Sequence, residues 1–145
     1  MNKIILQKKI KSVNIFIYAI VVVFLSCSSS PRYTSKTIFY GVSSHYGHND
    51  GFDGQLTANG EIFNQHGLSA AHKTLPLNTW VKVTNLDRLT KPSVRLKIND
   101  RGPYVGDRIL DCSSGAAKKL GFFEQGTANV KIEVIKFGDN KYHKN

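Results

Sequence analysis

A chain of 145 residues, 41% of them hydrophobic, has room for one compact domain and is too short for two. Its formal net charge is +10, and about six excess cations remain when the four lysines before Cys27 are set aside. A positive surface suits nucleic acid, anionic lipid or an acidic polymer, but no arginine-rich tract or aromatic-basic nucleic-acid motif is present. With only two cysteines, a disulfide framework is excluded.

The first 27 residues are typical of a secretory signal with a lipoprotein-like cleavage site. A lysine-rich leader without acids precedes an apolar run over residues 15–25, which is too short to span a bilayer. We therefore expect residues 1–27 to be a signal peptide ending at a lipidated Cys27, with plain secretion as the alternative. Lipid chains would anchor the protein to the cell envelope, and Ser28, which is not an acid, favours the outer membrane, facing the periplasm.

After this leader the sequence predicts three segments. Residues 28–36 are polar and serine-rich, which is typical of a short tether. A single domain is expected over residues 37–137, followed by a polar tail over residues 138–145 that should fray.

Within the domain, apolar residues recur mostly at every second position, which is the period of a half-buried strand. The segments with this pattern are residues 38–42, 81–83, 94–98 and 130–134. One helix is expected after Ser113 or Ser114, either of which can cap it, and Gly121 suits its left-handed end. Short strands with one or two short helices indicate a mainly β fold, closed as a barrel that leaves few exposed edges.

The residues suited to chemistry concentrate in two stretches, over residues 54–77 and 98–111. The first contains Glu61 and His72, and the second contains Asp100. Asp100 stands at the end of an alternating strand, just before a Gly-Pro turn, so its carboxylate should project from the barrel rim. Binding and catalytic sites are commonly built at such rims.

These stretches resemble the rare lipoprotein A family of septal lytic transglycosylases, which have a six-stranded double-psi β-barrel fold. The resemblance runs from about residue 41 to residue 135. Its motifs are Leu56-Thr57-Ala58-Asn59-Gly60-Glu61, Ala70-Ala71-His72-Lys73-Thr74-Leu75-Pro76, Val83-Thr84-Asn85-Leu86 and Asn99-Asp100-Arg101-Gly102-Pro103. It implies an enzyme without metal or cofactor that cleaves peptidoglycan between N-acetylmuramic acid and N-acetylglucosamine and leaves a 1,6-anhydro ring. Glu61, His72 and Asp100 match functional positions of the family.

Such a reaction needs one acid and base group, because the attacking hydroxyl belongs to the muramoyl sugar itself. We assign that role to Asp100, since its place at a strand end fixes its direction. Glu61 and His72 would position the sugar or stabilise the oxocarbenium-like transition state. Whether Glu61 is the acid instead stays open, and coupled groups would titrate together.

Further residues are predicted to bind the glycan. They are Tyr46, Thr57, Asn59, Asn64, Arg101 and Tyr104. Asn64 stands where the family commonly has Asp; it cannot ionise but can still hydrogen-bond sugar. His45 stands where the family often has Trp, so one wall of the site should differ.

Each functional interpretation has a structural alternative. Asp100 and Arg101 could form an ion pair that closes a turn, Glu61 could be a solvated loop acid, and His72 could be a hydrogen-bonded structural histidine. A buried Cys112 and an Arg108–Asp111 pair are expected to be structural. The rings of Tyr46, Trp80 and Tyr104 could either stack on sugar or pack in the core.

Two other functions could be considered for this sequence, a zinc enzyme and a wall-binding module. A zinc site is not expected, because His45 and His48 lack the flanking helix and Glu of a zinc peptidase. A non-catalytic module that binds or loosens wall glycan, as similar barrels in expansins do, is the alternative from another class. The expected partners are glycan strands and, through the anchor, a membrane, but not nucleic acid; any divisome partner and the choice between endolytic and exolytic cleavage stay open.

Overall fold

The computed structural model describes residues 37–143. The predicted signal peptide, lipidated Cys27 and tether lie outside the described residues. Within the described part, no helix combines the length and apolar character needed to cross a membrane.

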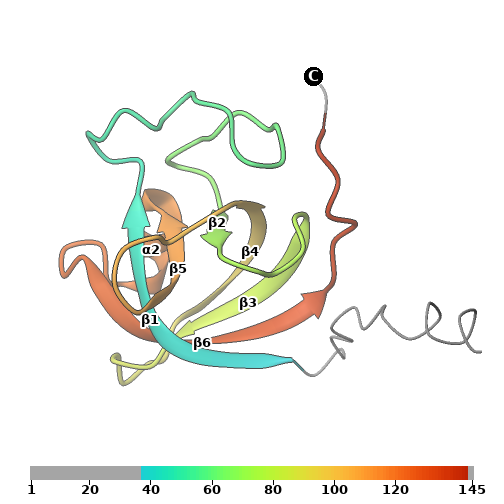
Figure 1. The fold of residues 1–145 in the computed structure, drawn as a ribbon. Coiled ribbons are helices and arrows are strands. Elements are labelled where there is room, and N and C mark those ends of the chain that lie inside the picture. Colours follow the sequence, from blue (N-terminus) through green and yellow to red (C-terminus); the bar gives the residue numbers. More distant parts are fainter. Residues whose placement is uncertain (1–36, 144–145) are drawn as a thin grey trace, which may run out of the picture. The chain divides into compact units, whose positions relative to one another are not determined.

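Six strands close into a barrel, with one short helix in the described chain (Figure 1). The elements are β1 (Ile38–Tyr46), β2 (Ser69–His72), β3 (Thr79–Asn85), β4 (Ser93–Asp100), β5 (Arg108–Ser113), α2 (Ser114–Leu120) and β6 (Thr127–Lys136). Around the barrel the strands follow the order β1-β5-β2-β4-β3-β6. The β1–β5 and β2–β4 pairs are parallel and the other pairs are antiparallel. The predicted closed, mainly β fold is confirmed.

The core is built from the alternating residues of three antiparallel strands. Their inward side chains are fully buried: Val81, Val83, Leu96, Ile98, Val130 and Ile132. Strand β1 differs from the prediction, because Ile38 and Tyr40 are exposed and Phe39 packs against the core instead. Gly41 in this strand lies so close to Ile109 that an added Cβ would be 2.9 Å from its side chain.

The helix closes one end of the barrel and follows its predicted ends. The Ser113 side chain accepts a hydrogen bond from the Ala116 amide at 3.4 Å, and Gly121 ends the helix with a φ of 74°. Cys112, just before the helix, is fully buried, and this burial raises the pKa of its thiol to about 12. The thiol is therefore protonated and inert, as the structural alternative expected.

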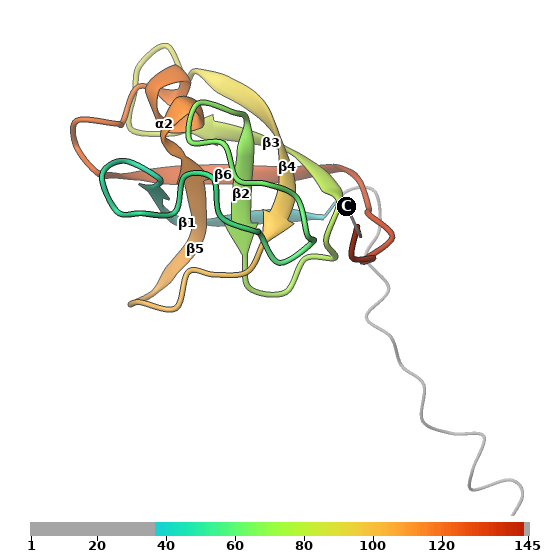
Figure 2. The same ribbon diagram turned by 90° about the horizontal axis from the view of Figure 1, so that it is seen from above.

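Residues 138–143 of the C-terminal tail lie against the barrel, where the sequence predicted a frayed end. The Gly138 amide donates to Thr79 Oγ1 at 3.0 Å, and the Asn140 amide donates to the Leu77 carbonyl at 3.1 Å. Figure 2 shows the red tail passing close to the start of β3. The sequence did not predict this, because the partners of these polar residues lie about 60 positions earlier.

Candidate functional site

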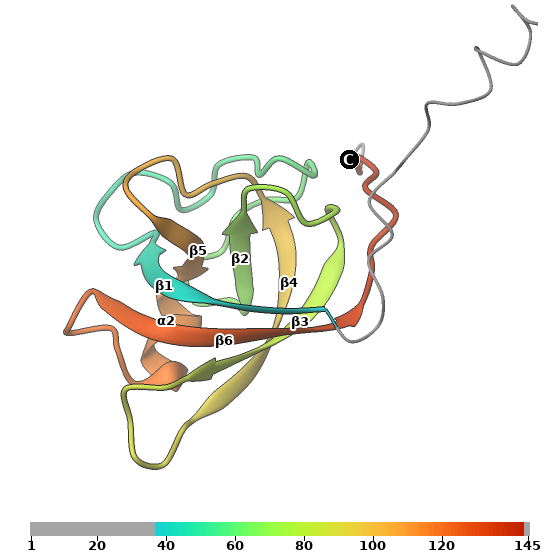
Figure 3. The same cartoon turned by 60° about the horizontal axis from the view of Figure 1, so that its bottom comes forward.

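Two long connections carry the predicted site residues, and both run along the top of the view in Figure 3. They are residues 47–68, between β1 and β2, and residues 101–107, between β4 and β5. The first connection crosses over β4, because the Asn59 amide donates to the Asn99 carbonyl at 3.0 Å. This crossing brings residues 57–61 next to the end of β4, where Asp100 lies.

Asp100 is held by three donors. Its Oδ1 accepts from the backbone amides of Ala58 at 3.0 Å and Arg101 at 2.9 Å. Its Oδ2 accepts from the Tyr46 hydroxyl at 3.2 Å. The carboxylate therefore has a fixed direction at the rim, and Oδ2 is the less occupied oxygen.

The Arg101 side chain does not pair with Asp100, so the alternative of an ion pair closing the turn is wrong. Its guanidinium donates to the carbonyls of His72 at 3.2 Å and Leu75 at 2.8 Å, and to Asn140 Oδ1 at 3.1 Å. These bonds use three of the five guanidinium N–H groups, and glycan binding by Arg101 stays a prediction. In this arrangement Arg101 links β4 to the connection after β2 and to the C-terminal tail.

The Tyr46 ring packs against other aromatic residues, which was the structural alternative for it, and its hydroxyl orients Asp100. The ring is stacked on Phe63, with centroids 4.3 Å apart and an interplanar angle of 16°, and Phe52 contacts it edge-on. Burial and the nearby Asp100 carboxylate raise the pKa of the phenol well above its usual value. The hydroxyl is therefore a permanent hydrogen-bond donor to Asp100.

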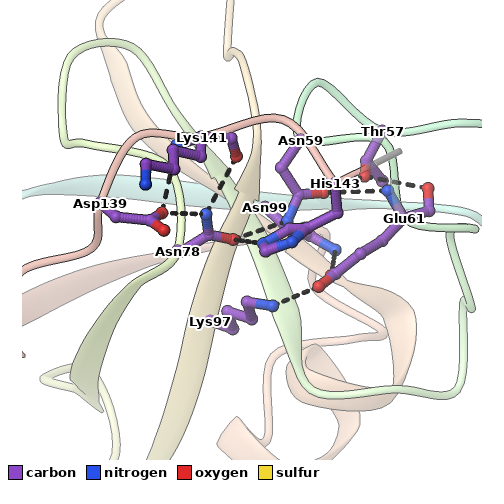
Figure 4. Close-up of polar contacts among 9 residues, drawn as sticks. All are labelled: Thr57, Asn59, Glu61, Asn78, Lys97, Asn99, Asp139, Lys141 and His143. Carbon is purple, nitrogen blue, oxygen red and sulfur yellow. Dashed lines mark hydrogen bonds and ion pairs between the residues drawn. The ribbon is translucent and has the colours of Figure 1, made fainter. Parts of the chain in front are cut away.

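Glu61 lies in a different environment, which Figure 4 shows. Its carboxylate forms an ion pair with Lys97, and its Oε2 accepts from Asn99 Nδ2 at 3.2 Å. Partial burial acts to raise the pKa of Glu61, but the hydrogen bonds from Lys97 and Asn99 outweigh it and hold this pKa below its ordinary value. Glu61 is therefore ionised around neutral pH, and it is not simply a solvated loop acid.

Thr57 and Asn59 build the loop and are not available to a substrate. Both are buried, and Asn59 is fully so. Asn59 Oδ1 accepts from the Thr57 hydroxyl at 2.7 Å and from the Glu61 amide at 3.1 Å, while its Nδ2 donates to Asn78 at 2.9 Å. The two residues shape the turn that presents Glu61.

His72 is held by the backbone of the connection after β2. Its Nδ1 accepts from the amides of Thr74 at 3.1 Å and Leu75 at 3.0 Å. Burial, reinforced by the charges of Arg101 and Lys73, lowers the pKa of His72 to about 4. The imidazole is therefore uncharged at neutral pH. Its Nδ1 is engaged by the two loop amides, which leaves the Nε2–H for another acceptor. A catalytic role for His72 stays a prediction and would have to use that atom.

The three predicted catalytic side chains each have their own hydrogen-bond partners. Among the described residues, no hydrogen bond joins Asp100, Glu61 and His72 directly. The loop of residues 57–61 connects the first two, and Arg101 connects Asp100 to the backbone of His72. The site therefore consists of two carboxylates with different surroundings and of His72, which is held by the connection after β2.

A shallow depression of about 220 Å³ opens beside Glu61. It is lined by Glu61, Ile62, Asn64, Gly67, Leu68, Ser69, Trp80, Lys97 and Asn99. Asn64 Oδ1 accepts from the His66 amide at 2.9 Å, which leaves its Nδ2 for a ligand. Tyr104 is 80% exposed and stands free at the tip of the connection after β4, where it is open to a ligand.

Sequence reasoning missed Lys97 and Asn99. Both were visible as the polar positions of the alternating strand β4, which indicated that they point outward. The pattern contained no signal that the loop of residues 57–61 would bring Glu61 to them. Arg108 and Asp111 do pair as expected, at 3.8 Å, and Ser44 bonds both side chains.

Among the described residues, no group of three or more His, Cys, Asp or Glu side chains is arranged to hold a metal ion. The His45 Nε2 bonds the Phe123 carbonyl at 3.0 Å, and its ring stacks on Phe123. His45 is therefore part of the packing beneath the helix.

The comparisons define the class of protein. A family model described as "Lytic transglycolase" matches residues 38–132, so the chain belongs to this family and its barrel is a double-psi β-barrel. A protein of Campylobacter jejuni named endolytic peptidoglycan transglycosylase RlpA is 52% identical over 100 residues, which cover 69% of this chain and 35% of that protein. A Pseudomonas aeruginosa protein of the same name is 55% identical over 95 residues, covering 66% of this chain and 27% of the relative. The match thus spans about a third of these relatives.

Two solved structures share the fold at low identity. An expansin of Clavibacter michiganensis superposes with a TM-score of 0.54 at 18% identity, covering 69% of this chain and 51% of the expansin. A papain inhibitor from Streptomyces gives a TM-score of 0.53 at 17% identity, covering 69% of this chain and 96% of the inhibitor. At this identity the likeness concerns the fold alone.

Proposed function

We propose that this domain is a peptidoglycan lytic transglycosylase that cleaves between N-acetylmuramic acid and N-acetylglucosamine and forms 1,6-anhydro ends. The names of the relatives support the reaction class. The observation that carries the proposal is the contrast between two carboxylates: Glu61 is kept ionised by Lys97, whereas Asp100 is aimed at the rim by three donors. Different environments are what give two carboxylates different roles.

In this mechanism Asp100 is the acid and then the base. Its Oδ2 donates a proton to the glycosidic oxygen as the bond from that oxygen to the muramoyl C1 breaks. The muramoyl 6-hydroxyl then attacks C1, and Asp100 takes up the hydroxyl proton, so the carboxyl group returns to its starting state. The two backbone amides on Oδ1 hold the group in place through both steps.

Glu61 serves as the fixed negative charge. A carboxylate whose pKa is held down cannot donate a proton near neutral pH, but it stabilises the positive charge of an oxocarbenium-like transition state. In this proposal Asp100, and not Glu61, is the acid. Because the depression beside Glu61 is shallow and open, we include endolytic cleavage within long strands in the proposal, as the relatives' name states for them.

The test is digestion of purified peptidoglycan, followed by chromatography and mass spectrometry of the products. Anhydromuropeptides should appear with the unaltered chain, disappear with Asp100→Asn and fall strongly with Glu61→Gln. Lys119→Gln, an exposed change on α2, serves as the control and should leave the yield unchanged. Sedimentation with sacculi without any soluble product would instead support the alternative, a non-catalytic wall-binding module.

We extend the proposal to location: the chain is exported and anchored by lipid on Cys27, on the strength of its leader. Palmitate labelling that is lost in Cys27→Ala would support it. Unlabelled protein in the soluble periplasmic fraction would favour plain secretion.

A further inference from the structure

Trp80 stands on the outer face of the barrel between two basic neighbours. It pairs across the sheet with Lys97 of β4 and with Lys136 of β6, and it is 43% exposed. Adjacent strands lie about 4.8 Å apart, so the indole and the two lysines form one row. A half-exposed tryptophan offers a flat apolar face, which is the surface that sugar rings stack on.

Depressions lie on both sides of Trp80. The first is the one beside Glu61 described above. The second measures about 340 Å³ and is lined by Asn78, Trp80, Lys97, Lys136, Phe137, Gly138, Asp139 and His143. Trp80 and Lys97 line both depressions, so the two form a continuous surface that leads away from Glu61.

The C-terminal tail builds the far wall of the second depression, and Asn78 fixes that wall (Figure 4). Asn78 Nδ2 donates to Asp139 Oδ1 at 2.6 Å and to the Lys141 carbonyl at 3.0 Å. Asn78 Oδ1 accepts from His143 Nε2 at 3.1 Å and from Asn59 Nδ2 at 2.9 Å. The same side chain therefore ties the wall of this depression to the loop that presents Glu61.

One residue that lines the first depression has a buried acceptor without a partner. Asn99 is only 4% exposed, its Nδ2 is used by Glu61, and its Oδ1 has no hydrogen-bond partner among the described residues. A buried carbonyl oxygen without a donor is costly, so it suits a ligand that brings an N–H group. The N-acetyl group of an amino sugar supplies such a donor.

The charge of this face is positive and partly uncompensated. Three cations on this face have no ion-pair partner among the described residues: Lys136, and the cross-strand neighbours Lys82 and Arg95. Glu133, which lies opposite Lys82, is already paired with Lys131 at 2.9 Å. Amide side chains and two carboxylates also line the depressions, which suits an acidic sugar better than the continuous phosphates of a nucleic acid.

We propose that Trp80 and Lys136 form a glycan subsite, in which the indole stacks on a sugar ring and the lysine binds the carboxylate of a muramyl residue on the strand that Asp100 cleaves. This inference rests on the proposed function, because it extends the path of the same strand. It also names a determinant of specificity, namely a preference for muramyl glycan over a neutral polymer of N-acetylglucosamine.

Trp80 provides the readout, because it is the only tryptophan of the chain. In the Asp100→Asn background, which prevents cleavage, peptide-free oligomers of alternating N-acetylglucosamine and N-acetylmuramic acid should shift the emission of Trp80. They should bind about tenfold more tightly than N-acetylglucosamine oligomers of equal length. Lys136→Gln should abolish that preference, whereas Lys119→Gln, which removes the same charge from the opposite end of the barrel, should retain it.

Kinetics on the same acidic oligomers give the second test. Trp80→Ala should raise KM about tenfold with kcat unchanged, and Trp80→Phe, which retains a ring, should raise it less. Equal urea midpoints for the variants and the unaltered chain would show that the fold is retained.

The outcomes separate the two proposals. If anhydro products form but Trp80 emission does not respond and Trp80→Ala leaves KM unchanged, the subsite is refuted while the lytic activity stands. An emission response without anhydro products retains the subsite as a binding site and refutes the catalytic function. Equal affinity for the acidic glycan and for single-stranded DNA would overturn the specificity.

Discussion

At the scale of single residues, the hydroxyl of Tyr46 is the most direct test of how Asp100 is held. Tyr46→Phe removes one donor from Oδ2 and retains the ring on Phe63. A hydrogen bond contributes about 0.5–1.5 kcal/mol, so kcat should fall by about two- to tenfold with little change in KM. The measurement is the initial rate of anhydro-end formation; an unchanged kcat would show that Tyr46 does not orient the acid.

His72 makes a separate prediction about stability and pH. Its folded pKa is about 4, below the ordinary value of 6.5, so the unfolded chain binds a proton more readily in this range. Stability should therefore fall as the pH is lowered from about 6.5 to about 4, by about 3 kcal/mol in total. The pKa of Glu61 is also lowered, so its contribution to stability is lost at lower pH, below its ordinary pKa of 4.5.

His72→Asn isolates this contribution, because the Asn Oδ1 can accept the two loop amides but does not titrate. Urea unfolding at several pH values should show that the variant loses most of the slope between pH 6.5 and 4. An identical slope in both proteins would place the titrating group elsewhere.

At the scale of elements, the alternating strands β3, β4 and β6 were predictable from sequence because one face of each is buried. Strands β2 and β5 were missed, since both are short and β2 buries consecutive residues, Ala70 and Ala71, without alternation. The position of Asp100 followed from its strand end. The Glu61–Lys97 pair could not be predicted, because the two residues are 36 positions apart and meet only where the loop crosses β4.

The C-terminal tail is the element whose removal tests this loop. Deleting residues 138–145 removes the hydrogen bonds that the tail makes with Leu77, Asn78 and Asn59. Several exposed hydrogen bonds at about 0.5–1.5 kcal/mol each should lower the free energy of unfolding by about 2 kcal/mol. Hydrogen exchange should show faster exchange of the amides in residues 57–61 and 76–79, with the core of β3 and β4 unaffected. Uniform loss of protection across the barrel would contradict a local role for the tail.

At the scale of the whole molecule, α2 packs at one end of the barrel, whereas Asp100, residues 101–107 and the tail lie at the other (Figure 3). The net positive charge of the chain is spread over an exposed surface, so its attraction for an acidic wall polymer should be screened by salt. Hydrogen bonds and stacking at the site are short-range and should be screened much less.

Salt therefore distinguishes the contribution of overall charge from that of the site. Between about 0.05 and 0.5 M NaCl, sedimentation with sacculi should fall several-fold, because the Debye length shortens to a few ångströms. The affinity for a neutral N-acetylglucosamine oligomer should stay nearly constant over the same range, and so should the urea midpoint. If binding of the acidic and neutral glycans responds equally to salt, long-range charge does not contribute to wall binding, and the contacts at the rim account for all of it.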